Sequence, residues 1–263
     1  MKFDIIPKNI NIPKDVQIPS DYAQKKQNVE YGIIQDIEYK AENQLFRAKV
    51  LLPPKFNPKV KYPTLYLLSG MGSNYEWTTI EHVDYIIGNL GNMVMDLIVV
   101  MPEILNIKSS SILEKKTDYS ELRVKMPFLI QKIEDVYPVL KGRENRSIAG
   151  LSMGGMCALY LSCIFDNTPY AFSTIGAISP SISLFEELFL NKKEFSFNKE
   201  NKYNFCLSTG TRDALLIQGA KRYQKLIKEG GFGCSFFTIE EKGHNWDAFS
   251  PLFYEFFVYY FKR

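Results

Sequence analysis

The sequence has 263 residues, of which 46% are apolar and 23% are charged, and its formal net charge is +3. These values exclude a disordered chain and fit a folded globular protein, and a single α/β domain commonly reaches this length. The 32 basic and 29 acidic residues are mixed along the chain without a basic stripe, so we expect no nucleic-acid partner.

Three prolines, Pro7, Pro13 and Pro19, recur through the first 30 residues, so residues 1–30 are predicted to form an extended arm. Residues 31–263 are expected to fold as a single domain, because neither a linker nor an internal repeat divides them. The sequence leaves open whether the arm packs on the domain, joins a homo-oligomer or does neither.

The N-terminus does not resemble a secretory signal, because Asp4 and Pro7 interrupt the apolar core that such a signal needs. No later run reaches the ~18 apolar residues of a membrane-spanning helix. We therefore expect no membrane span and a cytoplasmic protein, or a secreted one if a signal was removed from the chain.

Two strand patterns, 31–39 and 44–52, flank a short turn at 41–43 and predict an antiparallel hairpin. Two continuous apolar runs follow at 64–68 and 97–101. Such runs are typical of strands that are buried on both faces of a parallel sheet.

Strands and helices are expected to alternate along the rest of the chain. Further strands are predicted at 147–149, 171–178, 203–207 and 235–239. Helices are predicted at 79–89, at 119–140 with a bend near Pro138, after residue 152, at 214–228 and from about residue 246. The alternation indicates a three-layer α/β sandwich with a mostly parallel central sheet. Residues 181–202 fit it least well and are interpreted as a small insertion beside the site.

The cysteines lie in apolar surroundings, with no C-x-x-C pair and no histidine close enough to complete a zinc site. They are Cys157, Cys163, Cys206 and Cys234. We interpret them as buried thiols and expect no metal.

A serine stands between glycines in the stretch GLSMG at residues 150–154, which fits the pattern G-x-S-x-G. In this pattern the glycines allow a sharp turn from a strand into a helix, and the serine hydroxyl is exposed at the turn. Apolar residues recur at helical spacing after the turn, as that context requires. Ser152 is therefore a candidate nucleophile, and the alternative is a tight turn with a solvated serine.

A serine hydroxyl is a poor nucleophile until a base takes its proton, and the usual base is a histidine. The sequence has two histidines. His244 follows the last predicted strand and comes after the serine, in the chain order that G-x-S-x-G enzymes of this type use. His82 precedes the serine inside a predicted helix, and we interpret it as a surface or helix-packing residue.

Asp213 is the predicted carboxylate that orients the histidine, because it follows a strand and a glycine turn between Ser152 and His244. The alternative for Asp213 is a helix N-cap. Asp166 is interpreted as a helix-end residue, and Asp247 as the first turn of the terminal helix, where a carboxylate complements the helix dipole.

Acyl transfer also needs N–H donors for the oxyanion, usually one from the residue after the nucleophile and one from a loop after an early strand. These are predicted to be Met153 and Met71. The glycine-rich loop at 68–74, which holds Met71, lacks the lysine and the spacing of phosphate-binding motifs, so a nucleotide cofactor is not expected.

Four motifs in this order resemble the esterase D-like branch of the α/β-hydrolases. They are YPTLYLLSGMGSNYEW at 62–77, IAGLSMGG at 148–155, STGTRDAL at 208–215 and GHNWDAF at 243–249. The resemblance implies an α/β-hydrolase fold with an N-terminal hairpin. It also implies that Ser152 is the nucleophile, His244 the base and Asp213 its orienter, with Met71 and Met153 as oxyanion donors.

The sequence departs from this family in two places. Ser69 stands where many relatives carry histidine or aspartate, and the segment after Pro102 lacks the longer aromatic stretch of S-formylglutathione hydrolases. The sequence is most similar to short-chain, tributyrin-type esterases; feruloyl and acetylxylan esterases of carbohydrate esterase family 1 and mycolyltransferases belong to the same branch.

We therefore expect a serine carboxylesterase without a cofactor, acting on short-chain or carbohydrate-linked esters. Gly70, Tyr75, Trp77 and Trp246 are candidate substrate-binding residues, although the three aromatic residues are equally typical of ordinary core. Two alternatives stay open: an acyltransferase to a sugar or lipid hydroxyl, and a catalytically silent binding protein on the same scaffold.

Overall fold

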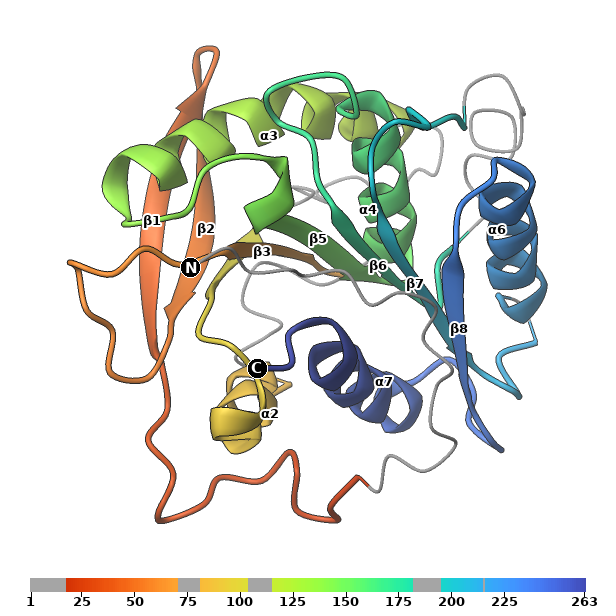
Figure 1. Ribbon diagram of the computed structural model, residues 1–263, viewed down its shortest axis with the longest axis horizontal. Helices are drawn as coiled ribbons and strands as arrows, with labels where there is room; N and C mark the ends of the chain where they lie inside the picture. The colour runs from red at the N-terminus through yellow and green to blue at the C-terminus, as the bar shows by residue number, and fades with distance from the viewer. Residues whose placement is uncertain (1–17, 71–80, 104–114, 182–194, 215) are drawn as a thin grey trace.

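Eight strands of the computed structural model form one sheet in the order β1-β2-β4-β3-β5-β6-β7-β8 (Figure 1). The structure describes residues 18–70, 81–103, 115–181, 195–214 and 216–263. The strands are β1 (Ile33–Ala41), β2 (Gln44–Leu52), β3 (Thr64–Leu68), β4 (Ile98–Pro102), β5 (Arg146–Leu151), β6 (Thr174–Ile178), β7 (Asn204–Gly210) and β8 (Cys234–Ile239). The pairs β1–β2 and β2–β4 are antiparallel and the others are parallel.

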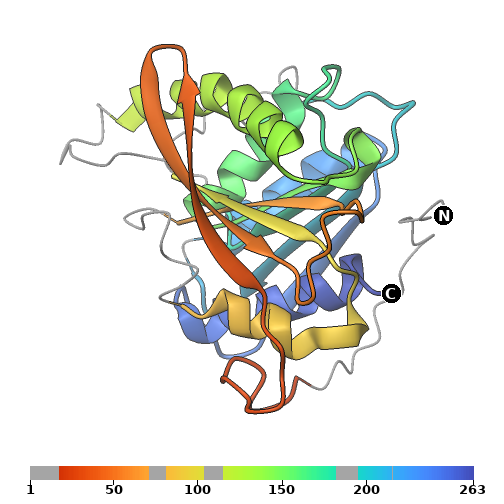
Figure 2. The ribbon, with the colours of Figure 1, turned by 90° about the vertical axis from the view of Figure 1, so that its left-hand side faces the viewer.

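Helices cover both faces of the sheet, as Figure 2 shows from the side. The described helices are α2 (Val83–Leu90), α3 (Lys115–Val136), α4 (Met153–Ile164), α6 (Ile217–Glu229) and α7 (Trp246–Tyr260), with short 3-10 helices η1 (Gly91–Met93) and η2 (Arg143–Asn145). The helices α3, α4 and α6 lie on one face, and α2 and α7 lie on the other. This arrangement confirms the predicted three-layer sandwich with an N-terminal hairpin.

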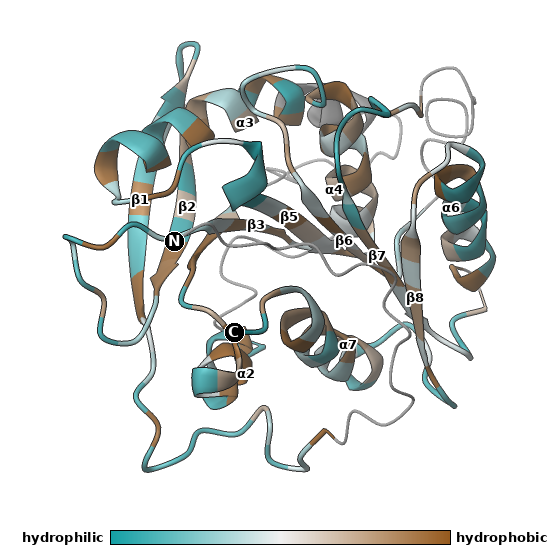
Figure 3. Ribbon diagram, viewed as in Figure 1, coloured by the Kyte–Doolittle hydropathy of each residue, from teal (hydrophilic) through white to brown (hydrophobic). Residues whose placement is uncertain are grey.

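Two apolar cores, one on each face, explain why the middle strands read as continuous apolar runs. Along β3, Tyr66 and Leu68 point into the core beneath α3 and α4, whereas Leu65 and Leu67 point into the core beneath α2 and α7. The middle strands are accordingly coloured as hydrophobic in Figure 3, while β1 and β2 alternate in hydropathy. A sheet covered on both faces requires apolar side chains on both.

Three helix predictions were wrong at their ends. The expected helix at 119–140 is α3, which begins at Lys115 and ends at Val136, before Pro138; the proline within it is Pro127. The helix expected at 79–89 is α2, so that His82 precedes the helix in a left-handed conformation (φ 54°). The helix expected at 214–228 begins only at Ile217. Helix ends depend on tertiary contacts that no periodicity records.

The described part of the predicted arm packs on α2 and α7. The Tyr22 hydroxyl donates to Ser250 Oγ at 2.6 Å, and Asn89 Nδ2 donates to the carbonyl oxygens of Tyr22 and Gln24. Tyr31 OH donates to Asn89 Oδ1 at 2.8 Å. Residues 18–31 therefore form a strap that joins α2 to α7; residues 1–17 of the predicted arm lie outside the described residues. The proposed insertion at 181–202 lies largely outside them as well.

Candidate active site

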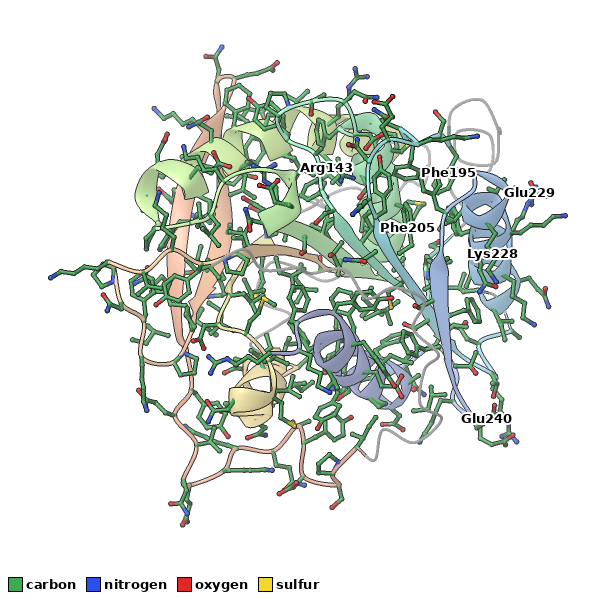
Figure 4. The ribbon with its side chains drawn as sticks, in the orientation of Figure 1. Arg143, Phe195, Phe205, Lys228, Glu229 and Glu240 are labelled. Carbon is green, nitrogen blue, oxygen red and sulfur yellow. The ribbon has the colours of Figure 1, made fainter. Side chains whose placement is uncertain are left out.

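The predicted nucleophile, acid and histidine all follow the carboxyl ends of parallel strands. Ser152 comes directly after β5, Asp213 shortly after β7 and His244 shortly after β8. Figure 1 shows the chain leaving the end of β8 and turning back into α7, and Figure 4 labels Glu240 at this turn. The carboxyl ends of parallel strands are where open α/β sheets place their ligand sites.

Ser152 occupies a sharp turn between β5 and α4. Its backbone has φ 54° and ψ −114°, which is unusual for a residue with a side chain. Its N–H donates to the Ile178 carbonyl oxygen at 2.8 Å, which fixes the turn against β6. A Cβ on Gly154 would lie 2.4 Å from the carbonyl oxygens of Leu68 and Ser69, so only glycine allows β3 to approach α4 this closely.

The imidazole of His244 lies between the side chains of Ser152 and Asp213. The Nε2 atom is 3.0 Å from Ser152 Oγ, and the Nδ1 atom is 2.8 Å from Asp213 Oδ2. The His244 side chain is 37% exposed, whereas that of Asp213 is 1% exposed. The arrangement thus joins a buried carboxylate, through one imidazole ring, to a hydroxyl in a half-buried turn.

The loops that carry Asp213 and His244 are held together by backbone contacts. The Arg212 N–H donates to the Lys242 carbonyl oxygen at 2.9 Å, and the Thr211 N–H donates to the Ile239 carbonyl oxygen at 2.9 Å. A Cβ on Gly210 would lie 2.1 Å from the Lys242 carbonyl oxygen. Glycine at this position therefore allows the histidine loop to lie directly on the end of β7.

Aromatic packing on α7 supports the ring of His244. The ring of Phe249 meets it edge to face, with ring centroids 4.9 Å apart. Phe249 lies in the first turns of α7 and is buried in the core beneath that helix. The imidazole is therefore positioned by Asp213 on one side and by the α7 core on another.

A family model described as "Putative esterase" matches residues 40–255. The chain belongs to this family. The match spans every strand from β2 to β8 and includes Ser152, Asp213 and His244. It confirms the predicted esterase family. Membership of this family indicates that the protein is a carboxylic ester hydrolase.

A curated relative is the endo-1,4-beta-xylanase/feruloyl esterase of Xylanibacter ruminicola, which is 25% identical over 235 residues. The alignment covers 85% of this chain but 31% of the relative, so the chain spans about a third of that protein's length.

Solved structures of esterases share the fold. The CE1 ferulic acid esterase of the anaerobic fungus Anaeromyces mucronatus is 23% identical with a TM-score of 0.80, and the alignment covers 92% of this chain and 95% of that one. A second structure of that enzyme is a complex with ferulic acid. The S-formylglutathione hydrolase of Staphylococcus aureus is 16% identical with a TM-score of 0.60, covering 86% and 95% of the two chains. At these identities the likeness establishes the α/β-hydrolase fold.

Of the other predicted site residues, three lie within the described residues and three lie outside them. Met153 is the first residue of α4, and a Cβ on Gly70 would lie 3.7 Å from Ser152 Cβ, so both lie beside the serine. Trp246 is half-buried at the start of α7, with its ring 5.9 Å from that of Phe253. The predicted residues Met71, Tyr75 and Trp77 lie outside the described residues.

The remaining candidates have other partners. His82 stacks on Tyr85, with ring centroids 4.6 Å apart and the planes nearly parallel. Asp166 accepts hydrogen bonds from the Asn198 N–H and the Tyr203 hydroxyl, and Asp247 lies in the first turn of α7. The N-cap alternative for Asp213 was wrong, because α6 begins four residues later and the carboxylate contacts His244.

Within the described ranges, no group of three or more His, Cys, Asp or Glu side chains is arranged to hold a metal ion. Burial raises the pKa values of Cys157, Cys206 and Cys234. Cys157 and Cys206 are buried as predicted, whereas Cys163 and Cys234 are only partly buried, so the prediction of buried thiols was wrong for these two. None of the described helices combines the length and the apolar character needed to cross a membrane.

The sequence did not predict the buried hydroxyl groups that are linked to the Asp213 carboxylate. Thr209 and Ser179 are fully buried, and their hydroxyls lie in line with the carboxylate. Thr209 stands in the stretch STGTRDAL but has no role assigned from the sequence, and Ser179 lies outside the four motifs. The one available signal was a pair of polar residues, Ser208 and Thr209, at the end of an otherwise apolar strand, where a buried hydroxyl needs a hydrogen-bond partner.

Proposed function

We propose that this protein is a serine carboxylesterase in which Ser152 is the nucleophile, His244 the general base and Asp213 the carboxylate that orients the imidazole. One observation carries the proposal: the His244 ring lies 3.0 Å from Ser152 Oγ and 2.8 Å from Asp213 Oδ2. Both distances are within hydrogen-bond reach, as proton transfer from the nucleophile requires.

The geometry favours one tautomer of His244. An ionised carboxylate can only accept a hydrogen bond, so the Asp213 side chain takes the proton of Nδ1. The Nε2 atom then carries the free lone pair and faces the Ser152 hydroxyl. This is the orientation that a general base needs in order to remove the serine proton.

The reaction proceeds through an acyl-enzyme. Ser152 Oγ attacks the ester carbonyl while His244 Nε2 takes its proton, and the protonated imidazole then gives that proton to the departing alcohol. Water attacks the acyl group in the second half of the cycle, with His244 again acting as the base. The Met153 N–H, at the start of α4 where helical N–H groups have no partner within the helix, is suited to stabilise the oxyanion. Met71 is the second predicted donor.

The substrate class that we propose is a carbohydrate-linked ester of an aromatic acid, of which a feruloyl ester is the example. The support comes from two relatives, the endo-1,4-beta-xylanase/feruloyl esterase of Xylanibacter ruminicola and the ferulic acid esterase of Anaeromyces mucronatus. The sequence predicted short-chain or carbohydrate-linked esters, and these relatives favour the carbohydrate-linked ones. The acyltransferase and binding-protein alternatives gain no support from the relatives.

The test compares the wild-type protein with Ser152→Ala on methyl ferulate, a feruloylated arabinoxylan oligosaccharide and p-nitrophenyl esters from acetate to octanoate. We expect the substitution to lower kcat by roughly 10⁴- to 10⁶-fold, because the covalent step is lost. Wild-type activity should rise with pH on the acid side of the profile, because the imidazole acts as a base only after it has lost its proton. Undiminished activity of Ser152→Ala would refute the mechanism. A preference for acetate over ferulate would refute the substrate class.

Three further expectations belong with this proposal. The cytoplasmic location expected from the sequence stays a prediction. Homo-oligomerisation and the lack of a nucleic-acid partner are likewise predictions. Size-exclusion chromatography with light scattering would decide the oligomeric state.

A further inference from the structure

Two buried hydroxyls lie in line behind Asp213. Ser179 Oγ donates to Thr209 Oγ1 at 3.2 Å, and Thr209 Oγ1 lies 3.5 Å from Asp213 Oδ2, the oxygen that also contacts His244. Both Ser179 and Thr209 are fully inaccessible to solvent, and Asp213 is almost so. A buried hydroxyl pair that ends on a buried carboxylate is costly unless its hydrogen bonds are used.

The direction of the hydroxyl protons follows from the donors and acceptors present. Thr209 Oγ1 has two acceptors at 3.5 Å, Asp213 Oδ2 and the Gly210 carbonyl oxygen. An ionised carboxylate is the stronger acceptor, so the Thr209 proton points at Asp213. Thr209 Oγ1 then accepts the proton of Ser179. Because 3.5 Å is long for an O–H···O bond, the effect on Asp213 is mainly that of a hydroxyl dipole aimed at a buried charge.

The backbone of Ser179 ties this pair to the turn that carries Ser152. Ser179 follows β6 directly and has φ 43°, a left-handed conformation that is unusual for a buried serine. Its N–H donates to the Ser208 carbonyl oxygen at 2.6 Å. On either side of it, the Ile178 carbonyl oxygen accepts from the Ser152 N–H and the Ser181 N–H donates to the Ser152 carbonyl oxygen. One turn therefore contacts Ser152 directly and is linked to Asp213 through Thr209.

We propose that Ser179 and Thr209 are positioning residues that hold Asp213 in its orientation and offset part of its negative charge. This inference rests on the proposed function of Ser152, His244 and Asp213. Neither hydroxyl contacts the reacting atoms. Their effect acts through Asp213, because the Thr209 dipole reduces the negative potential that this carboxylate exerts on the His244 ring.

Without the Thr209 hydroxyl, the Asp213 charge is less well compensated when His244 is neutral than when His244 is protonated. The protonated imidazole is then favoured, so His244 keeps its proton to a higher pH. At a given pH on the acid limb of the profile, a smaller fraction of the variant enzyme then has His244 in the neutral form that acts as the base.

Other charged groups on the same loops are in contact with solvent, and they are screened accordingly. Arg212 is exposed and paired with exposed Glu241. Glu240 accepts from Thr211 Oγ1, and Lys242 and Asp247 lie at the surface of the histidine loop and of α7. The Thr209 contact differs from these because it is buried.

The decisive comparison is Thr209→Val against Thr209→Ser. Valine has the shape of threonine without its hydroxyl, whereas serine keeps the hydroxyl and loses only the methyl group. For Thr209→Val we expect the acid limb of the kcat/KM profile to move up by about half a pH unit and kcat to fall about 3- to 10-fold with KM unchanged. Thr209→Ser should keep the wild-type profile.

Ser179→Gly supplies an independent variant, because glycine accepts the left-handed backbone while removing the hydroxyl. We expect it to move the profile in the same direction by a smaller amount, since Thr209 still contacts Asp213. Circular dichroism and thermal melting check that each variant is folded. If Thr209→Val does not fold, Ser179→Gly against wild type decides the question.

A second readout does not depend on ester hydrolysis. The sequence has two histidines, so His82→Gln leaves His244 as the single imidazole signal in an NMR titration. In that background Thr209→Val should move the midpoint of the His244 titration to higher pH, and Thr209→Ser should not. Equal midpoints in all three proteins would overturn the inference. Failure of the proposed function would appear separately, as a wild type without activity or an active Ser152→Ala.

Discussion

Asp213 and His244 are 31 residues apart in the sequence, yet their side chains are joined at 2.8 Å across the ends of two neighbouring parallel strands. The contact exists because β7 and β8 pair in register up to Gly210 and Ile239, and because the two loops that follow share backbone hydrogen bonds. The strand pairing therefore sets the distance between acid and imidazole before any side chain is considered.

The first prediction concerns the tautomer of His244. Asp213→Asn replaces an acceptor by a group that can donate, so the amide favours the imidazole with its proton on Nε2, facing Ser152. We expect kcat to fall by roughly 10³- to 10⁴-fold with little change in fold, as measured on an aryl ester alongside circular dichroism. The matched control is Asp247→Asn in the exposed first turn of α7, which should keep most of the activity. Similar losses in both variants would contradict the assignment of Asp213.

The second prediction concerns the close approach of the histidine loop to β7. In Gly210→Ala the new Cβ would lie 2.1 Å from the Lys242 carbonyl oxygen, so the loop must shift and carry His244 away from Ser152. We expect kcat to fall by about 10²-fold or more, since a displacement of about 1 Å is enough for that. Gly233→Ala is the control, because a Cβ there meets nothing within 4 Å. Comparable activity of the two variants would show that the loop contact is dispensable.

The sequence predicted which three side chains meet better than it predicted the ends of the helices. Each of these side chains lies in a recognisable local pattern. Ser152 stands in a glycine-flanked turn, Asp213 follows a strand and a glycine, and His244 lies in the loop before the terminal helix. By contrast, α3 ends at Val136 for two reasons: Pro138 disfavours a helical conformation in the residue before it, and residues 138–140 turn back to pair with Tyr62, a contact between segments that are far apart in sequence. No local pattern contains the second of these causes.

The support for the site was also beyond prediction. Thr209 lies just beyond the strand predicted at 203–207, and its contact with Ser179 arises only because β6 and β7 pair. Likewise, the proline-rich N-terminus reads as an extended arm, but Tyr22 and Tyr31 have partners on α7 and α2. Such contacts arise from the folded arrangement, and only the coordinates reveal them.

The third prediction concerns the strap of residues 18–31. Asn89 donates to two carbonyl oxygens of the strap and accepts from the Tyr31 hydroxyl, so Asn89→Ala leaves three polar groups without this partner. We expect the free energy of unfolding to fall by about 1–3 kcal/mol, as measured by urea denaturation. The control is Asn92→Ala, since Asn92 is exposed and, among the described residues, its side chain has a single long contact, at 3.5 Å from Arg263. Equal destabilisation by both substitutions would mean that the strap contributes little.

The fourth prediction concerns a carboxyl group inside α7. Burial raises the pKa of Glu255 from its ordinary value of 4.5 to about 7. The folded protein therefore binds this proton more tightly than the unfolded chain does, so the free energy of unfolding should fall as pH rises from about 4.5 to about 7. Above that range the group is charged in both states, and the whole cost of burying the charge opposes folding.

Glu255→Gln removes the charge and keeps the shape of the side chain. We expect this variant to melt at a higher temperature than wild type at pH 8 and at the same temperature at pH 4.5, where the carboxyl group is largely protonated in the folded protein. Glu200→Gln, at an exposed position, should change neither melting temperature. A gain in stability that is equal at both pH values would show that the substitution acts through packing, because only a titrating charge makes the difference depend on pH.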